Sequence, residues 1–219
     1  MSDYDVIVIG TDIAGGSIAA QCAAAGLKVP VTDSLPYGGT CAQRGCDSKK
    51  VLLAASEAVS RAQALAGQGL EGEPRIVWGD LIRRKREFVG GVPQRAEARL
   101  GDAGATLHAE ARFAGPDTLL IDGKRLQAGT IAIATGAIPR PLGISGEELL
   151  LHADGFMDLE ELPLRIVFMG GGYISFEFAA LARRRPAGRA SHPSRGRLPP
   201  LGCRPAVLRT RTDQASRAP

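Results

Sequence analysis

The amino-acid sequence predicts an α/β fold built on a parallel β-sheet, and three observations support this prediction. A short apolar run, a glycine turn and a helix-compatible stretch follow one another over residues 4–25. The same order returns over residues 164–182. Between them, turn residues divide residues 105–134 into short β segments. Strands that alternate with helices indicate βαβ units, and consecutive short strands indicate a meander.

The first unit begins with Tyr4–Ile9, an apolar run that is rich in β-branched residues and ends at Gly10. The small residues from 13 to 25 favour a helix that Gly26 closes, and residues 27–32 would form the second strand. This order of strand, turn, helix and strand predicts the opening βαβ unit of a parallel sheet.

The turn of this unit has most of the pattern of a nucleotide-binding site. Gly10 and Gly15 fit Gly-x-Gly-x-x-Gly, and Asp33 follows by about 20 residues, where an acid can accept both ribose hydroxyls of a nucleotide. Asp12 replaces the middle glycine, and its bulk and charge would oppose a diphosphate. Pro30 would remove one hydrogen bond of the second strand. An ordinary βα turn without a nucleotide is the alternative.

Two cysteines, Cys41 and Cys46, stand where a long helix is expected to begin. The short intervening segment allows the two thiols to meet in a small-loop disulfide. A helix N-terminus with Arg44, Lys49 and Lys50 nearby favours the thiolate that disulfide exchange needs. These features favour a redox-active pair.

The same spacing admits a structural disulfide, half of a zinc site or two free thiols. A zinc site needs a second cysteine pair, and the remaining Cys22 and Cys203 are isolated in unlike contexts. Zinc is therefore disfavoured. Spacing alone does not separate a redox-active disulfide from a structural one.

The remaining elements follow from apolar spacing in the long helix and from turn residues in the meander. A long amphipathic helix is expected from Ser48 to Ala66, and two shorter helices over residues 78–88 and 93–100. The β segments of the meander cover residues 106–108, 111–113, 118–121, 125–127 and 130–134. A second buried strand is expected over residues 164–169, before a glycine turn and a helix that runs to Ala182.

The net charge of +4 is unevenly distributed along the chain. Residues 183–219 contain ten arginines, one acid and six prolines, so the preceding part is net acidic. A basic tail can bind nucleic acid or an anionic membrane, but the acidic body supports neither partner. An Arg/Pro-rich composition without lysine is typical of an alternative reading frame of GC-rich DNA. We therefore expect a disordered or out-of-frame tail, with a genuine basic tail as the alternative.

The sequence contains no apolar run of membrane length, and its first residues lack the apolar core of a signal peptide. These features predict a cytoplasmic protein. In that compartment a cysteine pair is more often catalytic than structural.

Three motifs together resemble the flavin-dependent pyridine nucleotide-disulfide oxidoreductases, the family of glutathione reductase, lipoamide dehydrogenase and mercuric reductase. Gly38–Lys50, with the pattern Gly-Gly-Thr-Cys-x4-Cys-x-x-Lys-Lys, resembles the redox-active segment of this family. Ala-Thr-Gly at residues 134–136 resembles the end of its first FAD segment, and Gly170–Glu177 resembles its NAD(P)H-binding turn. Within this family, the Lys49-Lys50 pair resembles the glutathione reductase branch more than the lipoamide dehydrogenase branch.

The resemblance implies a Rossmann-like FAD-binding domain over residues 1–145, the beginning of an NAD(P)H-binding domain over residues 146–182, and the tail over residues 183–219. The implied cofactors are FAD and either NADP or NAD. The residues expected to bind them are Gly10, Gly15, Asp33, Gly39, Thr40, Lys49, Thr135, Gly136, Gly170, Gly172, Tyr173 and Glu177.

The resemblance also implies catalytic roles. Cys46 would be the thiolate that faces the flavin, and Cys41 would attack a small-molecule disulfide substrate. Lys49 would form an ion pair with Glu177 beside the flavin, and Tyr173 would cover the nicotinamide pocket.

The expected function is an FAD-dependent NAD(P)H:disulfide oxidoreductase with a Cys41–Cys46 redox disulfide. Family members are homodimers whose dimerisation domain supplies a His-Glu acid-base pair. That domain and the rest of the NAD(P)H domain are not recognised in this sequence, so we expect an incomplete and inactive form. A non-catalytic flavin-binding or dithiol fragment is the alternative.

Overall fold

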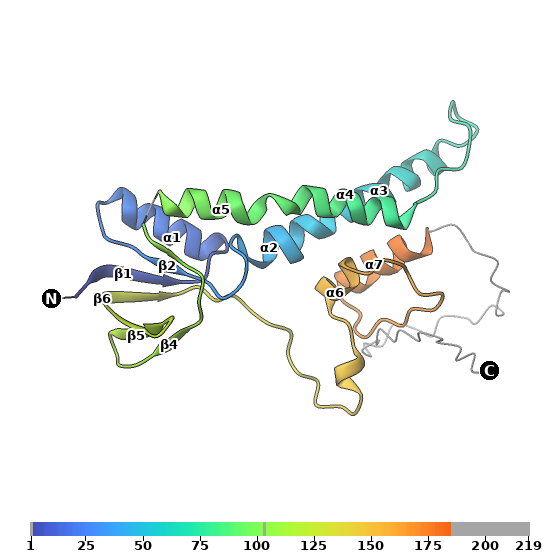
Figure 1. Ribbon diagram of the computed structural model, residues 1–219. Helices are drawn as coiled ribbons and strands as arrows, with labels where there is room; N and C mark the ends of the chain where they lie inside the picture. The colour runs from blue at the N-terminus through green and yellow to red at the C-terminus, as the bar shows by residue number, and fades with distance from the viewer. Residues whose placement is uncertain (1, 103, 185–219) are drawn as a thin grey trace, which may run out of the picture. The chain divides into compact units, whose positions relative to one another are not determined.

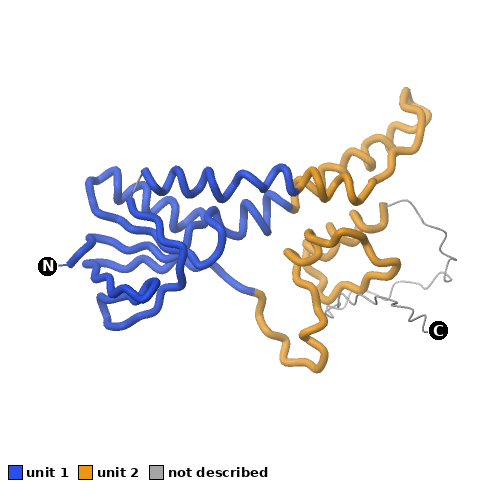
Figure 2. Tube along the Cα trace, viewed as in Figure 1, with its two compact units in different colours: residues 1–48, 86–138 blue, residues 49–85, 139–219 orange. Residues whose placement is uncertain are grey.

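The computed structural model describes residues 2–102 and 104–184. These residues pack as two compact units, which Figure 2 colours separately. The first unit contains residues 1–48 and 86–138, and the second contains residues 49–85 and the described residues from 139 onward.

The first unit is built on a six-stranded sheet with the order β3-β2-β1-β6-β5-β4 (Figure 1). The strands are β1 (Tyr4–Ile9), β2 (Val31–Thr32), β3 (Thr106–Leu107), β4 (Ala111–Phe113), β5 (Thr118–Ile121) and β6 (Lys124–Ile133). β1 pairs in parallel with β2 and β6, and β2 pairs in parallel with β3. β4, β5 and the first part of β6 form an antiparallel meander. The predicted Rossmann-like sheet with an added meander is confirmed.

Alternate residues of β1 face two different hydrophobic cores. Val6 and Val8 pack with residues of α1 (Ile13–Ala24) and α5 (Val92–Gly101). Ile7 lies on the opposite face and packs with buried residues of the meander, namely Leu119, Ile121 and Ala128. Because side chains alternate along a strand, β1 fixes helices to one face of the sheet and the meander to the other.

Three further helices match the sequence prediction closely. α3 (Cys46–Ala64) begins two residues before the predicted start, and α4 (Trp78–Gly90) and α5 lie where helices were expected. A short helix that was not predicted, α2 (Gly39–Arg44), precedes α3. The hydroxyl of Ser48 donates to the carbonyl of Gln43 at 2.5 Å and thereby links α3 to α2. No helix in the described part of the chain is long and apolar enough to cross a membrane.

The second unit has its own core, to which α3, α4, α6 (Ala153–Met157) and α7 (Tyr173–Arg183) contribute. A short 3₁₀ helix, η1 (Glu147–Leu149), precedes α6. Phe156 of α6 stacks on Phe178 of α7 with 4.3 Å between ring centroids. The indole nitrogen of Trp78 donates to the carbonyl of Leu159 at 2.8 Å, which satisfies the polar end of a buried ring.

The second predicted strand is shorter than expected. Only Val31–Thr32 forms the strand β2, although the carbonyls of Lys28 and Pro30 still accept hydrogen bonds from amides of β1. Pro30 is tolerated because its carbonyl accepts from the amide of Val8 at 3.0 Å, and its nitrogen carries no proton that would need a hydrogen-bond acceptor. The segments expected at 125–127 and 130–134 form the single strand β6, which continues through residues 128 and 129.

The strand predicted over residues 164–169 is wrong, because these residues form no strand in the structure. Leu164 and Val167 expose 75% and 51% of their surface instead of being buried. A strand needs a neighbouring strand for its amides, and no strand of the described residues pairs with this segment. The domain bounds expected at residues 145 and 182 remain predictions, and the tail lies almost wholly outside the described residues.

Candidate dithiol and nucleotide site

A groove of about 560 Å³ lies at the carboxyl ends of the parallel strands in the first unit. Its lining contains eight of the residues that the sequence predicted for the site: Gly10, Asp33, Gly39, Thr40, Cys41, Cys46, Thr135 and Gly136. In the strand order, β2 and β3 lie on one side of β1, and β6, β5 and β4 lie on the other. The groove at the end of β1 is therefore at a topological switch point, where α/β sheets bind their ligands. A larger hollow of about 930 Å³ in the second unit contains none of the predicted residues.

Two glycines of the turn after β1 are required by packing. Gly10 has a φ angle of +104°, and a Cβ there would come within 2.2 Å of the carbonyl oxygen of Ala134 in the chain after β6. A Cβ on Gly15 would come within 1.9 Å of the carbonyl oxygen of Gly10. The first glycine therefore permits the tight turn, and the third permits close contact between α1 and that turn.

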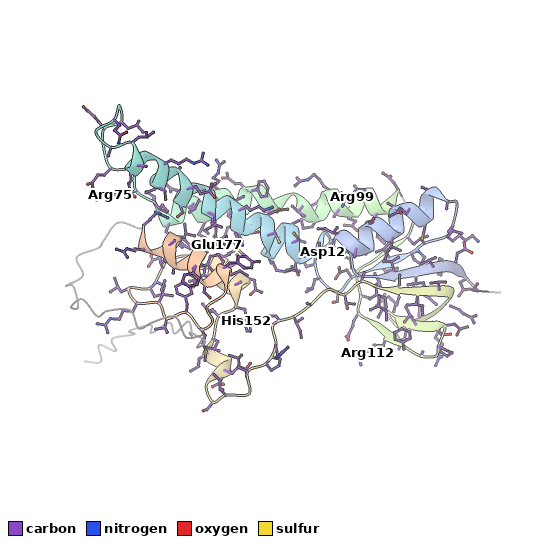
Figure 3. All side chains as sticks on the ribbon, turned by 180° about the vertical axis from the view of Figure 1, so that it is seen from behind. Asp12, Arg75, Arg99, Arg112, His152 and Glu177 are labelled. Carbon is purple, nitrogen blue, oxygen red and sulfur yellow. The ribbon has the colours of Figure 1, made fainter. Side chains whose placement is uncertain are left out.

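Asp12 occupies the place of the middle glycine and caps α1. Figure 3 labels this residue. Its Oδ1 accepts from the amide of Ile13 at 2.8 Å. Its Oδ2 accepts from the amides of Thr40 at 2.9 Å and Cys41 at 3.2 Å. The carboxylate thus occupies amide donors at the N-termini of α1 and α2, which are the donors that a diphosphate would use. A dinucleotide diphosphate does not fit this turn while Asp12 is in place.

Asp33, the predicted ribose acceptor, is also engaged within the protein. Its Oδ2 accepts from the amide of Thr11 at 3.0 Å and from the Thr11 hydroxyl at 2.6 Å. Its Oδ1 accepts from the amide of Leu35 at 3.0 Å. A carboxylate offers about four acceptor positions, so these three bonds leave fewer than the two that a bidentate ribose contact needs.

Cys41 lies half-buried in α2, Cys46 is the exposed first residue of α3, and both are free thiols in this structure. A hydrogen bond with the Cys46 side chain raises the pKa of the Cys41 thiol, and burial and the negative charges of Cys46 and Asp47 raise that pKa further. The expectation that helix and lysine charges favour a thiolate is therefore wrong for Cys41.

The predicted ion pair between Lys49 and Glu177 is present in the second unit. Lys49 Nζ on α3 lies 2.6 Å from Glu177 Oε2 on α7, and the two side chains expose 14% and 34% of their surface. The same Nζ lies 4.4 Å from the ring centroid of Tyr173, within the range of a cation–π contact. Tyr173 is itself exposed. These contacts fix the start of α7 against α3.

The glycine turn before α7 keeps its local form without a preceding strand. Gly170 has a φ angle of +108°, and Gly172 caps α7 without a side-chain hydrogen bond. The predicted NAD(P)H-binding residues Gly170, Gly172 and Tyr173 therefore lie at one helix N-terminus. The segment before them, residues 164–169, does not hold this turn in a sheet.

Two residues of the first unit were missed by the sequence analysis. The Thr11 hydroxyl donates to Asp33 and accepts from the amide of Gly38 at 3.1 Å, so it joins three loops at the groove. The Tyr37 hydroxyl donates to the carbonyl of Leu107 at 2.8 Å. Burial raises the pKa of Tyr37 to about 12. A threonine beside the glycine turn was the available signal for the first residue, and no local pattern indicates the second.

In the described part of the chain, no three His, Cys, Asp or Glu side chains gather as potential metal ligands. Cys203 lies outside the described residues.

Comparison with known proteins gives one consistent result. Residues 4–192 match the family described as pyridine nucleotide-disulphide oxidoreductase. The chain is 34% identical over 181 residues to glutathione reductase of Burkholderia cepacia, covering 82% of this chain and 40% of that protein. It is 33% identical over 192 residues to dihydrolipoyl dehydrogenase of Thermus scotoductus, covering 84% of this chain and 41% of that protein.

A solved structure is also similar: the HOCl-induced flavoprotein disulfide reductase RclA from Escherichia coli superimposes with a TM-score of 0.71 at 26% identity. The superposition covers 83% of this chain and 40% of that chain. The chain thus spans about two-fifths of the length of the relatives it matches.

Proposed function

Because this chain belongs to the pyridine nucleotide-disulphide oxidoreductase family, we propose that Cys41 and Cys46 are a reversible dithiol–disulfide couple that exchanges with small-molecule disulfides. The observation that supports this most directly is that both cysteines line the same groove, on the consecutive helices α2 and α3, which only Gly45 separates. The Cys46 side chain also raises the pKa of the Cys41 thiol, which is consistent with neighbouring thiols.

The proposed exchange has two steps and is balanced within the named reactants. The Cys41 thiolate attacks one sulfur of a disulfide RSSR, which breaks the S–S bond and releases one RS⁻. The Cys46 sulfur then attacks Cys41 in the mixed disulfide, forms the Cys41–Cys46 bond and releases the second RS⁻. The two thiol protons pass to the released thiolates, so RSSR is reduced by two electrons and the cysteine pair is oxidised.

The two cysteines are held by hydrogen bonds of the helices that carry them. Cys41 is fixed in α2, whose N-terminal amides are held by Asp12. Cys46 begins α3, and Ser48 ties the start of that helix to Gln43. Both cysteines are therefore held on helices, as an exchange site requires. We assign Lys49 and Glu177 a positioning role, because their ion pair joins α3 to α7 in the second unit.

FAD and NAD(P)H are the cofactors that the resemblance implies, and the family chemistry would use them to reduce the disulfide. We propose that this chain alone does not carry out that NAD(P)H-driven turnover. The engaged carboxylate of Asp12 at the diphosphate position supports this proposal. Residues 164–169, which form no strand before the second glycine turn, support it independently, because hydride transfer requires a rigidly held nicotinamide.

Reaction of the reduced protein with a small aromatic disulfide tests the exchange. Two coloured thiolates should be released for each Cys41–Cys46 bridge formed, and peptide mapping should find that bridge. Cys22, half-buried on α1, provides the matched control, because Cys22→Ser should leave the bridge unchanged. Mixed disulfides on separate cysteines with no Cys41–Cys46 bridge would contradict the proposal. NADPH or NADH oxidation with added FAD and oxidised glutathione should stay at the level without protein.

A further inference from the structure

We infer that Asp12 is a built-in replacement for a diphosphate. Its carboxylate caps α1 and α2 together, closes the anion position of the first glycine turn to dinucleotides, and holds the Cys41 segment in place without a cofactor. This inference goes beyond the exchange reaction and does not rest on it.

The first step of the argument concerns the hydrogen-bond donors. The first amides of a helix have no partner within the helix, and they favour a negative group at that end. Ile13 is the first residue of α1, and Thr40 and Cys41 lie in the first turn of α2. All three amides donate to the Asp12 carboxylate. In other proteins such helix amides bind a phosphate, whereas here they bind the carboxylate of one side chain.

The second step concerns space. A Cβ on Gly39 would lie 2.2 Å from both Cβ and Cγ of Asp12, so the side chain of Asp12 lies directly against the backbone of α2. Gly10 and Gly15, which the turn needs for its own packing, are retained. The middle glycine of the pattern instead serves the close approach of a pyrophosphate. The turn therefore keeps its fold, while the position reserved for the ligand is filled.

The third step concerns the surrounding charge. Arg44 lines the groove together with Asp33 and Glu110, and Arg95 and Arg99 line an adjoining hollow that also reaches Asp12 and Asp47. Removal of the Asp12 carboxylate would leave three acids balanced by three arginines, with the helix amides free to bind an anion. The site should then attract a diphosphate that the native side chain excludes.

The test compares the native protein with Asp12→Gly and Asp12→Asn, and uses FAD and ADP as probes. ADP contains the diphosphate without the flavin. Binding is measured by flavin fluorescence for FAD and by titration calorimetry for ADP. Asp12→Gly should bind both probes at least about tenfold more tightly than the native protein, because a like charge and its bulk are removed. Asp12→Asn should stay nearer the native affinity than Asp12→Gly does, because it removes the charge but keeps the bulk, and its side-chain oxygen can still accept from these amides.

The capping role has its own readout. Without ligand, Asp12→Gly should melt about 2–4 °C below the native protein, because it loses the hydrogen bonds from Thr40 and Cys41 to a charged group, worth about 1 kcal/mol in a chain of this size. Saturating ADP should restore part of that loss in the variant and none in the native protein.

The native protein alone also decides the question if the glycine variant does not fold. The amide signals of Ile13, Thr40 and Cys41 in ¹⁵N spectra should not move when FAD or ADP is added. Movement of these signals, or native affinity equal to that of Asp12→Gly, would overturn the inference. Thiol exchange by the same native sample, measured without any nucleotide, reports separately on the dithiol proposal.

Discussion

Replacing Cys46 by alanine should make Cys41 react faster with an alkylating reagent at neutral pH. The hydrogen bond with the Cys46 side chain is the largest cause that raises the pKa of the Cys41 thiol. Cys46→Ala removes that bond together with the charge of a Cys46 thiolate. Burial and Asp47 remain, so the pKa of Cys41 should fall toward its ordinary value without reaching it.

The size of the effect follows from the balance between thiolate fraction and nucleophilicity. Below the pKa, each unit by which the pKa falls raises the thiolate fraction tenfold, while the thiolate itself becomes about threefold less nucleophilic. The net gain in rate at neutral pH is therefore about threefold for each unit of pKa that is relieved. At pH values above both pKa values the order reverses, because every thiol is then ionised and the native thiolate is the stronger nucleophile.

The assay is the rate of iodoacetamide alkylation at Cys41 as a function of pH, followed by peptide mass spectrometry. Cys46→Ser keeps a hydrogen-bonding group of similar size and should give an intermediate midpoint. Cys22 serves as the reference within the same molecule, and its rate should not change. An unchanged midpoint for Cys41 in Cys46→Ala would mean that the two side chains do not share a proton, and the argument for their proximity would fail.

Three further predictions concern stability, measured by urea unfolding. Lys49→Met and Glu177→Gln should each destabilise the second unit by about 1 kcal/mol, since the pair is only partly buried, and the double variant should lose less than the sum. Gly39→Ala should cost more than about 2 kcal/mol, because its Cβ would clash with Asp12 at a φ angle of +72°, and the cost should be smaller in an Asp12→Gly background; equal costs would contradict the close contact. Tyr37→Phe should cost about 1 kcal/mol at pH 7 through one lost hydrogen bond. Because the pKa of Tyr37 is raised from 10.0 to about 12, its contribution is complete below pH 10 and is lost as the pH rises toward 12, a loss that the phenylalanine variant should not show.

Local patterns were sufficient for the elements whose stability is local. α1 follows from its small helix-forming residues, and the helix at residues 46–64 follows from its apolar spacing. The helices at residues 78–90 and 92–101 also lie where local patterns predicted them. β1 could be recognised because a β-branched run before a glycine has few other uses. The glycine turn could be predicted because its shape needs glycine at positions 10 and 15, where any side chain would clash with the backbone.

The strands that were misjudged depend on partners distant in sequence. β6 continues through Ala128 and Gly129 because its later residues pair with β1, more than 120 residues earlier. No local pattern carries that information. Residues 164–169 have the composition of a buried strand, but composition does not supply a neighbouring strand, and none of the described strands pairs with them. An apolar run therefore predicts burial only where the chain also provides a sheet to receive it.

The site shows the same division between local and long-range information. The sequence indicated that Asp12 would oppose a diphosphate, since bulk and charge are properties of the residue itself. It could not indicate that the carboxylate would accept from Thr40 and Cys41, which are 28 and 29 residues away. Because of these hydrogen bonds, the Asp12 carboxylate occupies the position in the turn where a diphosphate would bind. The change at Asp12 therefore does more than weaken a ligand site, because the same side chain that excludes the diphosphate also secures the helix that carries Cys41.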